Sequence, residues 1–128
     1  MSNEVKQKSI LIIEDDTFLA TIYKNKFEAE GFRVYTETNG EAGLDTFLKK
    51  IPSLVLLDVL LPKMDGFTIL QKAKQSKKIM HVPIILLTNL GHTDDVKKGM
   101  ELGAIDYLIK AHFKPSETVK KVKNILNT

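Results

Sequence analysis

The chain has no cysteine, only one arginine and no long apolar run, and each absence excludes a class of protein. Without cysteine there is no disulfide framework, no thiolate nucleophile and no cysteine-based zinc site, which fits a reducing compartment. The apolar run ILII at 10–13, which follows a polar N-terminus, is far too short for a signal-peptide core or a membrane span. We therefore expect a cytoplasmic protein that makes no membrane contact.

Arg33 is the only arginine, so the net charge of +3 comes almost entirely from lysine. Lysines spread over several helices are typical of solvated surfaces, whereas direct readout of bases favours the bidentate fork of arginine. We therefore expect no direct binding of nucleic acid. The 128 residues show no linker, repeat or low-complexity tract. The expected organisation is a flexible N-terminal segment at 1–8 and one folded domain at 9–127, with no appended effector.

Five short apolar runs alternate with amphipathic helical patterns along the chain. The runs are SILII ending at 13, FRVYT near 32–36, SLVLL ending at 57, VPIILL ending at 87 and AIDYLI ending at 109. Such runs predict strands buried on both faces, and helical spacing recurs at 18–27, 42–48, 67–73, 96–102 and 119–126. Gly31 and Gly103 suit helix C-termini, Pro115 suits a first helical position and Thr93 suits an N-cap.

A strand–helix alternation repeated five times predicts an α/β fold with a doubly wound, five-stranded parallel sheet and helices on both faces. The common small arrangement of this kind is flavodoxin-like and has the strand order 2-1-3-4-5. In such sheets, ligands bind outside the carboxyl ends of the strands, beside the point where the strand order reverses. The residues that follow each strand are therefore the first candidates for a functional site.

Four of the five predicted strands run directly into polar residues. The first is followed by Glu14, Asp15 and Asp16, the third by Asp58, the fourth by Thr88 and Asn89, and the fifth by Lys110. Parallel strands bring these ends to one edge, about 4.8 Å apart per strand, with Asp58 in the centre. Two carboxylates about 5 Å apart repel by roughly 3 kcal/mol at an effective dielectric constant of 20. One lysine cannot neutralise three acids, so the pattern predicts a bound cation.

Clustered oxygen ligands without histidine or cysteine suit a hard divalent ion, and few protein ligands with room for phosphate oxygens favour Mg²⁺ over Ca²⁺. The Thr88 hydroxyl and the Lys110 ammonium would then hold anionic oxygens. The set predicts phosphoryl transfer to a carboxylate nucleophile. Asp16 is more typical of a helix cap than of a metal ligand. The histidines are too scattered for a metal site and are expected at the surface: His81, His92 and His112.

The motifs LIIEDD, LVLLDVLLPKMDGF, IILLTN and DYLIK, in this order and spacing, resemble the receiver domain of two-component response regulators. The resemblance runs from about 9 to 126 and is to the stand-alone, single-domain type. It implies that Asp58 accepts a phosphoryl group from a histidine kinase or a phosphotransfer protein. Such a protein is no enzyme in the usual sense, because it catalyses only its own phosphoryl transfer and autodephosphorylation. The family itself has the 2-1-3-4-5 order, so the two fold predictions are not independent.

The resemblance also implies roles for the other residues of the site. Asp15 would bind Mg²⁺ directly and Glu14 through water, with Asp58 and the backbone carbonyl of Leu60 as further ligands. Thr88 and Lys110 would hold phosphoryl oxygens. A shift of Thr88 would be coupled to Tyr107, whose reorientation changes the face formed by the fourth helix, the fifth strand and the fifth helix. A downstream protein would bind that face, and the chain would be a monomer or a phosphorylation-dependent dimer.

Three departures from the family pattern stand out. Asn89 replaces the usual alanine or glycine after Thr88 and could crowd or hydrogen-bond at the entrance to the site. Ala111 replaces a proline that often follows a cis bond, and a cis bond before a non-proline residue costs roughly 3 kcal/mol. Leu60 and Leu90 are apolar and cannot orient an attacking water, so we expect slow autodephosphorylation.

Other functions use a similar pattern. A phosphorylation-independent pseudo-receiver, which serves only as an interaction module, would be expected to lose at least one of the five polar site residues, all of which are present here. A magnesium-dependent aspartyl phosphatase would have a second acid two residues after its nucleophile, where this chain has Leu60. A flavin carrier would need a hydroxyl-rich phosphate loop after the first strand, where this chain has acids.

Overall fold

The computed structural model of the chain describes residues 7–112 and 114–128. Its strands are β1 (Ser9–Ile13), β2 (Arg33–Glu37), β3 (Leu54–Asp58), β4 (Ile84–Thr88) and β5 (Asp106–Ile109). They form one sheet in the order β2-β1-β3-β4-β5, and every pairing is parallel. The predicted class and strand order are therefore confirmed.

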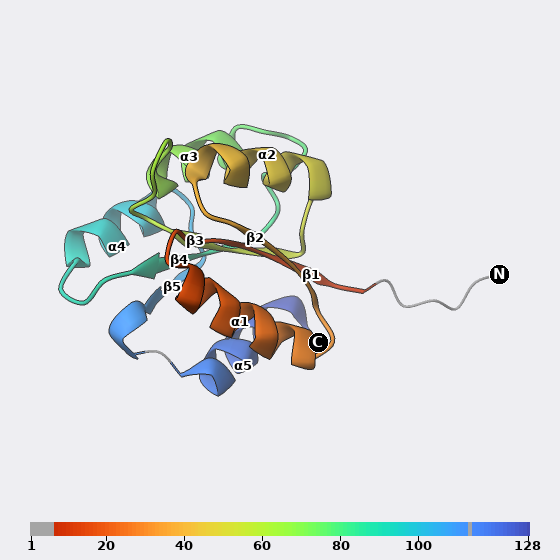
Figure 1. Ribbon diagram of the computed structural model, residues 1–128. Coiled ribbons are helices and arrows are strands. Elements are labelled where there is room, and N and C mark those ends of the chain that lie inside the picture. Colours follow the sequence, from red (N-terminus) through yellow and green to blue (C-terminus); the bar gives the residue numbers. More distant parts are fainter. Residues whose placement is uncertain (1–6, 113) are drawn as a thin grey trace.

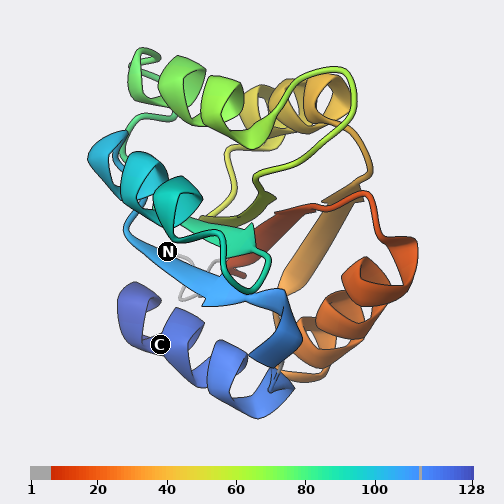
Figure 2. The same cartoon turned by 90° about the vertical axis from the view of Figure 1, so that its left-hand side faces the viewer.

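Helices α1 to α4 connect the strands, and a short 3-10 helix and α5 follow the last strand. They are α1 (Thr17–Ala29), α2 (Gly40–Lys50), α3 (Gly66–Lys74), α4 (Thr93–Glu101), η1 (Lys110–His112) and α5 (Pro115–Leu126). Helices α1 and α5 lie on one face of the sheet, and α2, α3 and α4 lie on the other (Figures 1 and 2). Within the described ranges, every helix is too short or too polar to cross a bilayer.

Most of the segment expected to be flexible, 1–8, lies outside the described residues. Gln7 and Lys8 are described, and both contact the folded chain: the Gln7 amide donates to the Gly31 carbonyl at 3.0 Å and Lys8 Nζ donates to the Leu126 carbonyl at 3.3 Å. The backbone ladder between β1 and β2 also begins here, because Arg33 N–H donates to the Lys8 carbonyl.

Each face of the sheet has its own apolar core because successive strand residues point to opposite sides. Leu11 and Ile13 pack with α2 and α3, whereas Ile10 and Ile12 pack with α1 and α5. Strands β3 and β4 are buried throughout and β1 nearly so, as their apolar runs predict. The expectation of two buried faces is wrong for β2 and β5, because these strands form the edges of the sheet and are covered incompletely.

The helix ends follow the local sequence with one exception. Asp16 caps α1 by accepting from Leu19 N–H, Pro115 is the first residue of α5, and Gly31 and Gly103 have positive φ just after α1 and α4. The exception is Thr93, which is the first helical residue and not the N-cap. His92 takes the N-cap position without a side-chain hydrogen bond, so the α4 N-terminus depends on the acids of its first turn, Asp94 and Asp95.

Gly66 brings the start of α3 against the end of β3. Its N–H donates to the Val59 carbonyl at 2.8 Å, which closes the loop after Asp58. A Cβ at this position would lie 2.4 Å from the Asp58 carbonyl oxygen and 2.9 Å from Val59 Cα. These are backbone atoms and cannot turn aside, so the loop that carries Asp58 needs glycine here.

We predict that Gly66→Ala destabilises the protein by about 2 kcal/mol, although alanine normally favours a helix. The measurement is the free energy of unfolding in urea. Gly91→Ala is the control: Gly91 has φ +86 and open space around its Cα, so only the conformational penalty of about 1 kcal/mol remains. A Gly66→Ala protein as stable as the wild type would contradict the steric argument.

Candidate functional site

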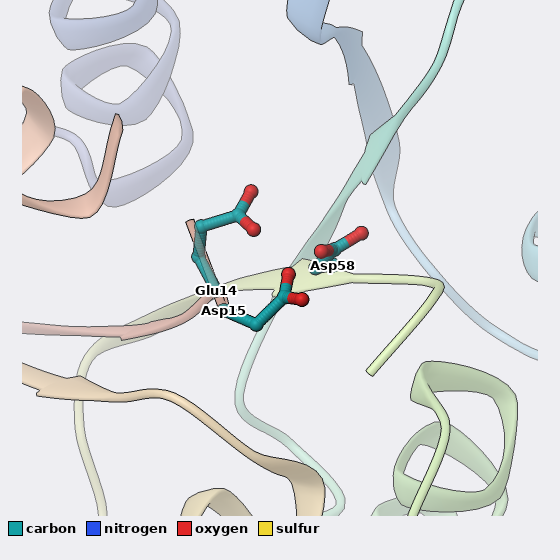
Figure 3. Close-up of side chains that lie close together, drawn as sticks. All are labelled: Glu14, Asp15 and Asp58. Carbon is teal, nitrogen blue, oxygen red and sulfur yellow. The ribbon is translucent and has the colours of Figure 1, made fainter. Parts of the chain in front are cut away.

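Three acids meet at the carboxyl ends of β1 and β3. Because Ile13 lies opposite Leu57 in the sheet, the next residues, Glu14 and Asp58, are neighbours. One carboxylate oxygen from each of Glu14, Asp15 and Asp58 lies within 4.8 Å of the other two. Figure 3 shows the three side chains converging on one space beyond the strand ends. Glu14 and Asp58 are buried, with 0% and 3% exposure, whereas Asp15 is exposed to solvent.

Lys110 supplies the positive charge that this cluster needs. It begins η1 directly after β5, two strands away from β3, and its side chain reaches back across β4. Its Nζ lies 2.7 Å from Glu14 Oε1 and 2.9 Å from Asp58 Oδ2. Burial alone would lower the pKa of Lys110, but the hydrogen bonds and charges of the two acids raise it above its usual value. The ammonium therefore stays charged.

The two buried acids differ in their environments. Glu14 Oε2 accepts from Asp16 N–H at 3.0 Å, and Asp58 Oδ1 accepts from Leu60 N–H at 3.2 Å. Burial and a hydrogen bond with Asp58 raise the pKa of Glu14 to about 8, against the opposing effects of Lys110 and the Asp16 N–H. The Glu14 carboxyl thus holds its proton more strongly than an ordinary glutamate, which lessens the repulsion between the two buried acids.

Thr88 ends β4 on the other side of Asp58. Its side chain is buried, and its Oγ1 has no hydrogen-bond partner among the described residues. A buried hydroxyl without a partner costs about 1–3 kcal/mol, so an acceptor that reaches it would be favoured. A cavity of about 110 Å³ lies beside it, lined by Asn89, His92 and Tyr107 among others. Tyr107 itself is 38% exposed on β5.

The departures from the family pattern lie around this site. Asn89 follows Thr88 and is exposed at the mouth of the cavity. Ala111 lies within η1, and the described residues contain no cis peptide bond. Leu60 and Leu90 expose 56% and 61% of their surface in the loops that follow β3 and β4.

The donor set suits a magnesium ion. All the clustered donors are oxygens, two of the acids are buried with one lysine between them, and no histidine or cysteine joins the cluster. A hard cation is the ligand that such a set favours. The Leu60 N–H contacts Asp58, so the loop that carries the predicted Leu60 carbonyl ligand adjoins the cluster.

The structure brings together Glu14, Asp15, Asp58 and Lys110, and it places Tyr107 apart from them at the cavity beside Thr88. Sequence reasoning missed three contributors: the bridging of both buried acids by Lys110, the backbone N–H groups of Asp16 and Leu60, and the close approach of Gly66. The PKMDG turn was a signal for Gly66, since a glycine at a helix start favours close packing. No sequence pattern specified the two N–H donors.

A family model of the response regulator receiver domain matches residues 10–123. The protein named probable transcriptional regulator ycf27 from Porphyra purpurea is 37% identical over 123 residues, which are 96% of this chain and 49% of that protein. A structure from Chloroflexus aurantiacus described as a response regulator has a TM-score of 0.89 at 36% identity, covering 96% of this chain and 100% of that chain. The chain belongs to the receiver domain family, the signalling modules of two-component response regulators.

The chain spans about half the length of the curated relatives it matches. The receiver domain of the sensor histidine kinase PA1611 from Pseudomonas aeruginosa has a TM-score of 0.86 at 24% identity, covering 96% of this chain and 100% of that chain. At that identity the likeness shows the fold alone. The resemblance drawn from the four sequence motifs is thus confirmed at the level of the family.

We predict that Lys110→Met destabilises the protein by about 2 kcal/mol, because methionine removes the ammonium that contacts both buried acids, Glu14 and Asp58. Unfolding in urea with EDTA measures the change. Adding Glu14→Gln to Lys110→Met should restore part of the loss, since glutamine keeps an acceptor for the Asp16 N–H and cannot ionise. The control is Lys49→Met, which breaks the exposed Lys49–Asp45 pair and should cost less than about 0.5 kcal/mol. Equal losses in the two methionine variants would contradict this account.

Proposed function

We propose that the chain is a phosphoacceptor switch in which Asp58 receives a phosphoryl group from a histidine kinase or a phosphotransfer protein. The observation that carries the proposal is the convergence of Glu14, Asp15, Asp58 and Lys110 at one sheet edge. Membership of the receiver family supports it. The presence of all five polar site residues argues against a pseudo-receiver, which is not otherwise supported.

The proposed reaction uses the Asp58 carboxylate as a nucleophile. One of its oxygens forms a bond to phosphorus while the P–N bond to the donor imidazole breaks, and the imidazole nitrogen keeps the electron pair. The product is an acyl phosphate on Asp58. Lys110 already contacts Asp58 at 2.9 Å and could exchange a carboxylate contact for a phosphoryl oxygen. The Thr88 hydroxyl, buried without a partner in the described part of the chain, could donate to another.

Magnesium would be held by Asp15, by Asp58 and the Leu60 carbonyl, and by Glu14 through water. When bound, it supplies positive charge that offsets the acids and the phosphoryl oxygens. The all-oxygen donor set supports this assignment. The Pseudomonas receiver domain, which shares the fold, has a magnesium ion coordinated in its active-site cleft.

The proposed output is a change in the face formed by α4, β5 and α5. Thr88 and Tyr107 line the same cavity of about 110 Å³, so a Thr88 that moves toward a phosphoryl oxygen would open space next to the Tyr107 ring. Tyr107 could turn inward from its half-exposed position, which is a change that a downstream protein can detect. The partner, a cytoplasmic location and the oligomeric state remain predictions.

We predict that incubation with a small phosphodonor and Mg²⁺ adds one phosphoryl group to the wild type and none to Asp58→Asn. Intact-mass spectrometry measures the product, and EDTA should prevent its formation. Asp16→Asn is the matched control, because asparagine caps α1 as well as aspartate does and Asp16 is not a proposed ligand. Lack of any gain in the wild type would overturn the proposal and favour a phosphorylation-independent module.

We predict that Leu60→Asn shortens the lifetime of the phosphorylated form by roughly tenfold or more, because an amide can orient an attacking water and leucine cannot. The measurement is the decay of phosphorylated protein by intact mass after the donor is removed. Leu60→Met, which stays apolar at the same exposed position, should leave the lifetime unchanged. An unaltered lifetime in Leu60→Asn would refute the role assigned to Leu60.

A further inference from the structure

A second polar groove lies at the opposite end of the sheet from the acids. It measures about 600 Å³ and is lined by Gln7, Lys8, Ser9, Arg33, Tyr35, Lys50, Ile51 and Ser53. These residues lie near the amino ends of β1, β2 and β3 and at the end of α2 (Figure 1). Its volume is within the range of about 300–1,000 Å³ that is typical of small-molecule sites. The proposed function uses none of these residues.

The charge of this groove is one-sided. Three of its described lining residues, Lys8, Arg33 and Lys50, are basic, and none of the described ones is acidic. Lys8 Nζ is bound to the Leu126 carbonyl, but the Arg33 guanidinium has no hydrogen bond or ion pair within 7–112 and 114–128. Within the part of the chain that the structure describes, Lys50 Nζ contacts the Tyr35 ring, 5.5 Å from its centroid, and makes no ion pair. Two cationic groups thus remain available on the wall of one groove.

The groove also offers neutral donors. The Ser53 hydroxyl accepts from Ser9 N–H at 3.0 Å and can donate its own hydrogen. The Gln7 amide uses one N–H on the Gly31 carbonyl and keeps a second. Arg33 is the first residue of β2 and pairs with Ser9 of β1, so its backbone is held in the sheet. A guanidinium fork with flanking lysine and hydroxyl donors suits a phosphate ligand, which has more oxygens to accept hydrogen bonds than a carboxylate ligand has.

We propose that this groove binds an oligophosphate chain, either an inorganic one or the phosphate tail of a nucleotide. A chain of several phosphates offers oxygens to more than one of the basic side chains that line the groove, and the groove's volume of about 600 Å³ leaves room for it. The alternative role of Lys50 is to offset the α2 dipole, as Lys49 in the same turn does. That role predicts a loss of stability in a Lys50 variant, and the proposed site predicts a loss of affinity. The inference is independent of the phosphorylation of Asp58.

The test is isothermal titration of the full chain with tripolyphosphate and with ATP, in EDTA so that no metal bridges the ligand to the acids. We expect saturable binding of one ligand per chain, with a dissociation constant below about 1 mM. Arg33→Gln and Lys50→Gln should each weaken it roughly tenfold. Thermal unfolding of the same variants should stay close to the wild type because both side chains are exposed.

Lys77→Gln is the matched control, since it removes the same charge from an exposed site in the loop after α3, outside the groove. It should change the affinity by less than about twofold. Equal binding of the two probes would assign the site to the phosphate chain, and tighter binding of ATP would assign it to a nucleotide. Binding that does not saturate, or an equal loss in Lys77→Gln, would overturn the proposal.

Discussion

The structure depends on one electrostatic constraint: two carboxylates are buried side by side at a sheet edge, and a third is next to them. Such a group is stable only if a counter-charge or a proton offsets it. Both are present, since Lys110 bridges Glu14 and Asp58 while burial raises the pKa of Glu14 to about 8. The fold thus holds Glu14 and Asp58 side by side at the sheet edge, in an all-oxygen arrangement that suits a cation.

The other elements of the fold fix the positions of the residues at this sheet edge. Parallel pairing brings the ends of β1, β3, β4 and β5 to one side, so residues that are far apart in sequence become neighbours. The two apolar cores hold the strands from both faces, and Gly66 lets α3 begin against the Asp58 backbone. Movement of any of these elements would change the separation of the acids, which is why the chemistry and the stability of this protein depend on the same contacts.

Much of this arrangement can be predicted from the sequence because strand ends are local features. Asp58 and Glu14 each follow an apolar run that predicts a strand. Because the strands are parallel, their carboxyl ends meet at one edge and bring the two acids together. The sequence does not reveal features that depend on packing between distant segments. The start of α4 depends on the turn before His92, and the reach of Lys110 to both acids depends on the η1 geometry. The incomplete burial of β2 and β5, by contrast, follows from the predicted strand order, which makes them the edges of the sheet. Side-chain patterns carry no information on backbone donors such as Asp16 N–H.

Helix polarity contributes to the difference in charge between the two ends of the sheet. In a doubly wound fold every helix begins near the carboxyl edge of the sheet and ends near the amino edge. Acids favour helix starts and lysines favour last turns, as Asp94 and Asp95 in α4 and Lys49 and Lys50 in α2 illustrate. Helix polarity thus accounts for Lys50 in the groove beside Arg33, whereas the acids around Asp58 follow strands β1 and β3 and the first turns of α1 and α3 contain no acid. Under the two proposals, an anionic phosphodonor would need a cation at the acidic carboxyl edge, whereas an anion in the groove beside Arg33 would need no metal.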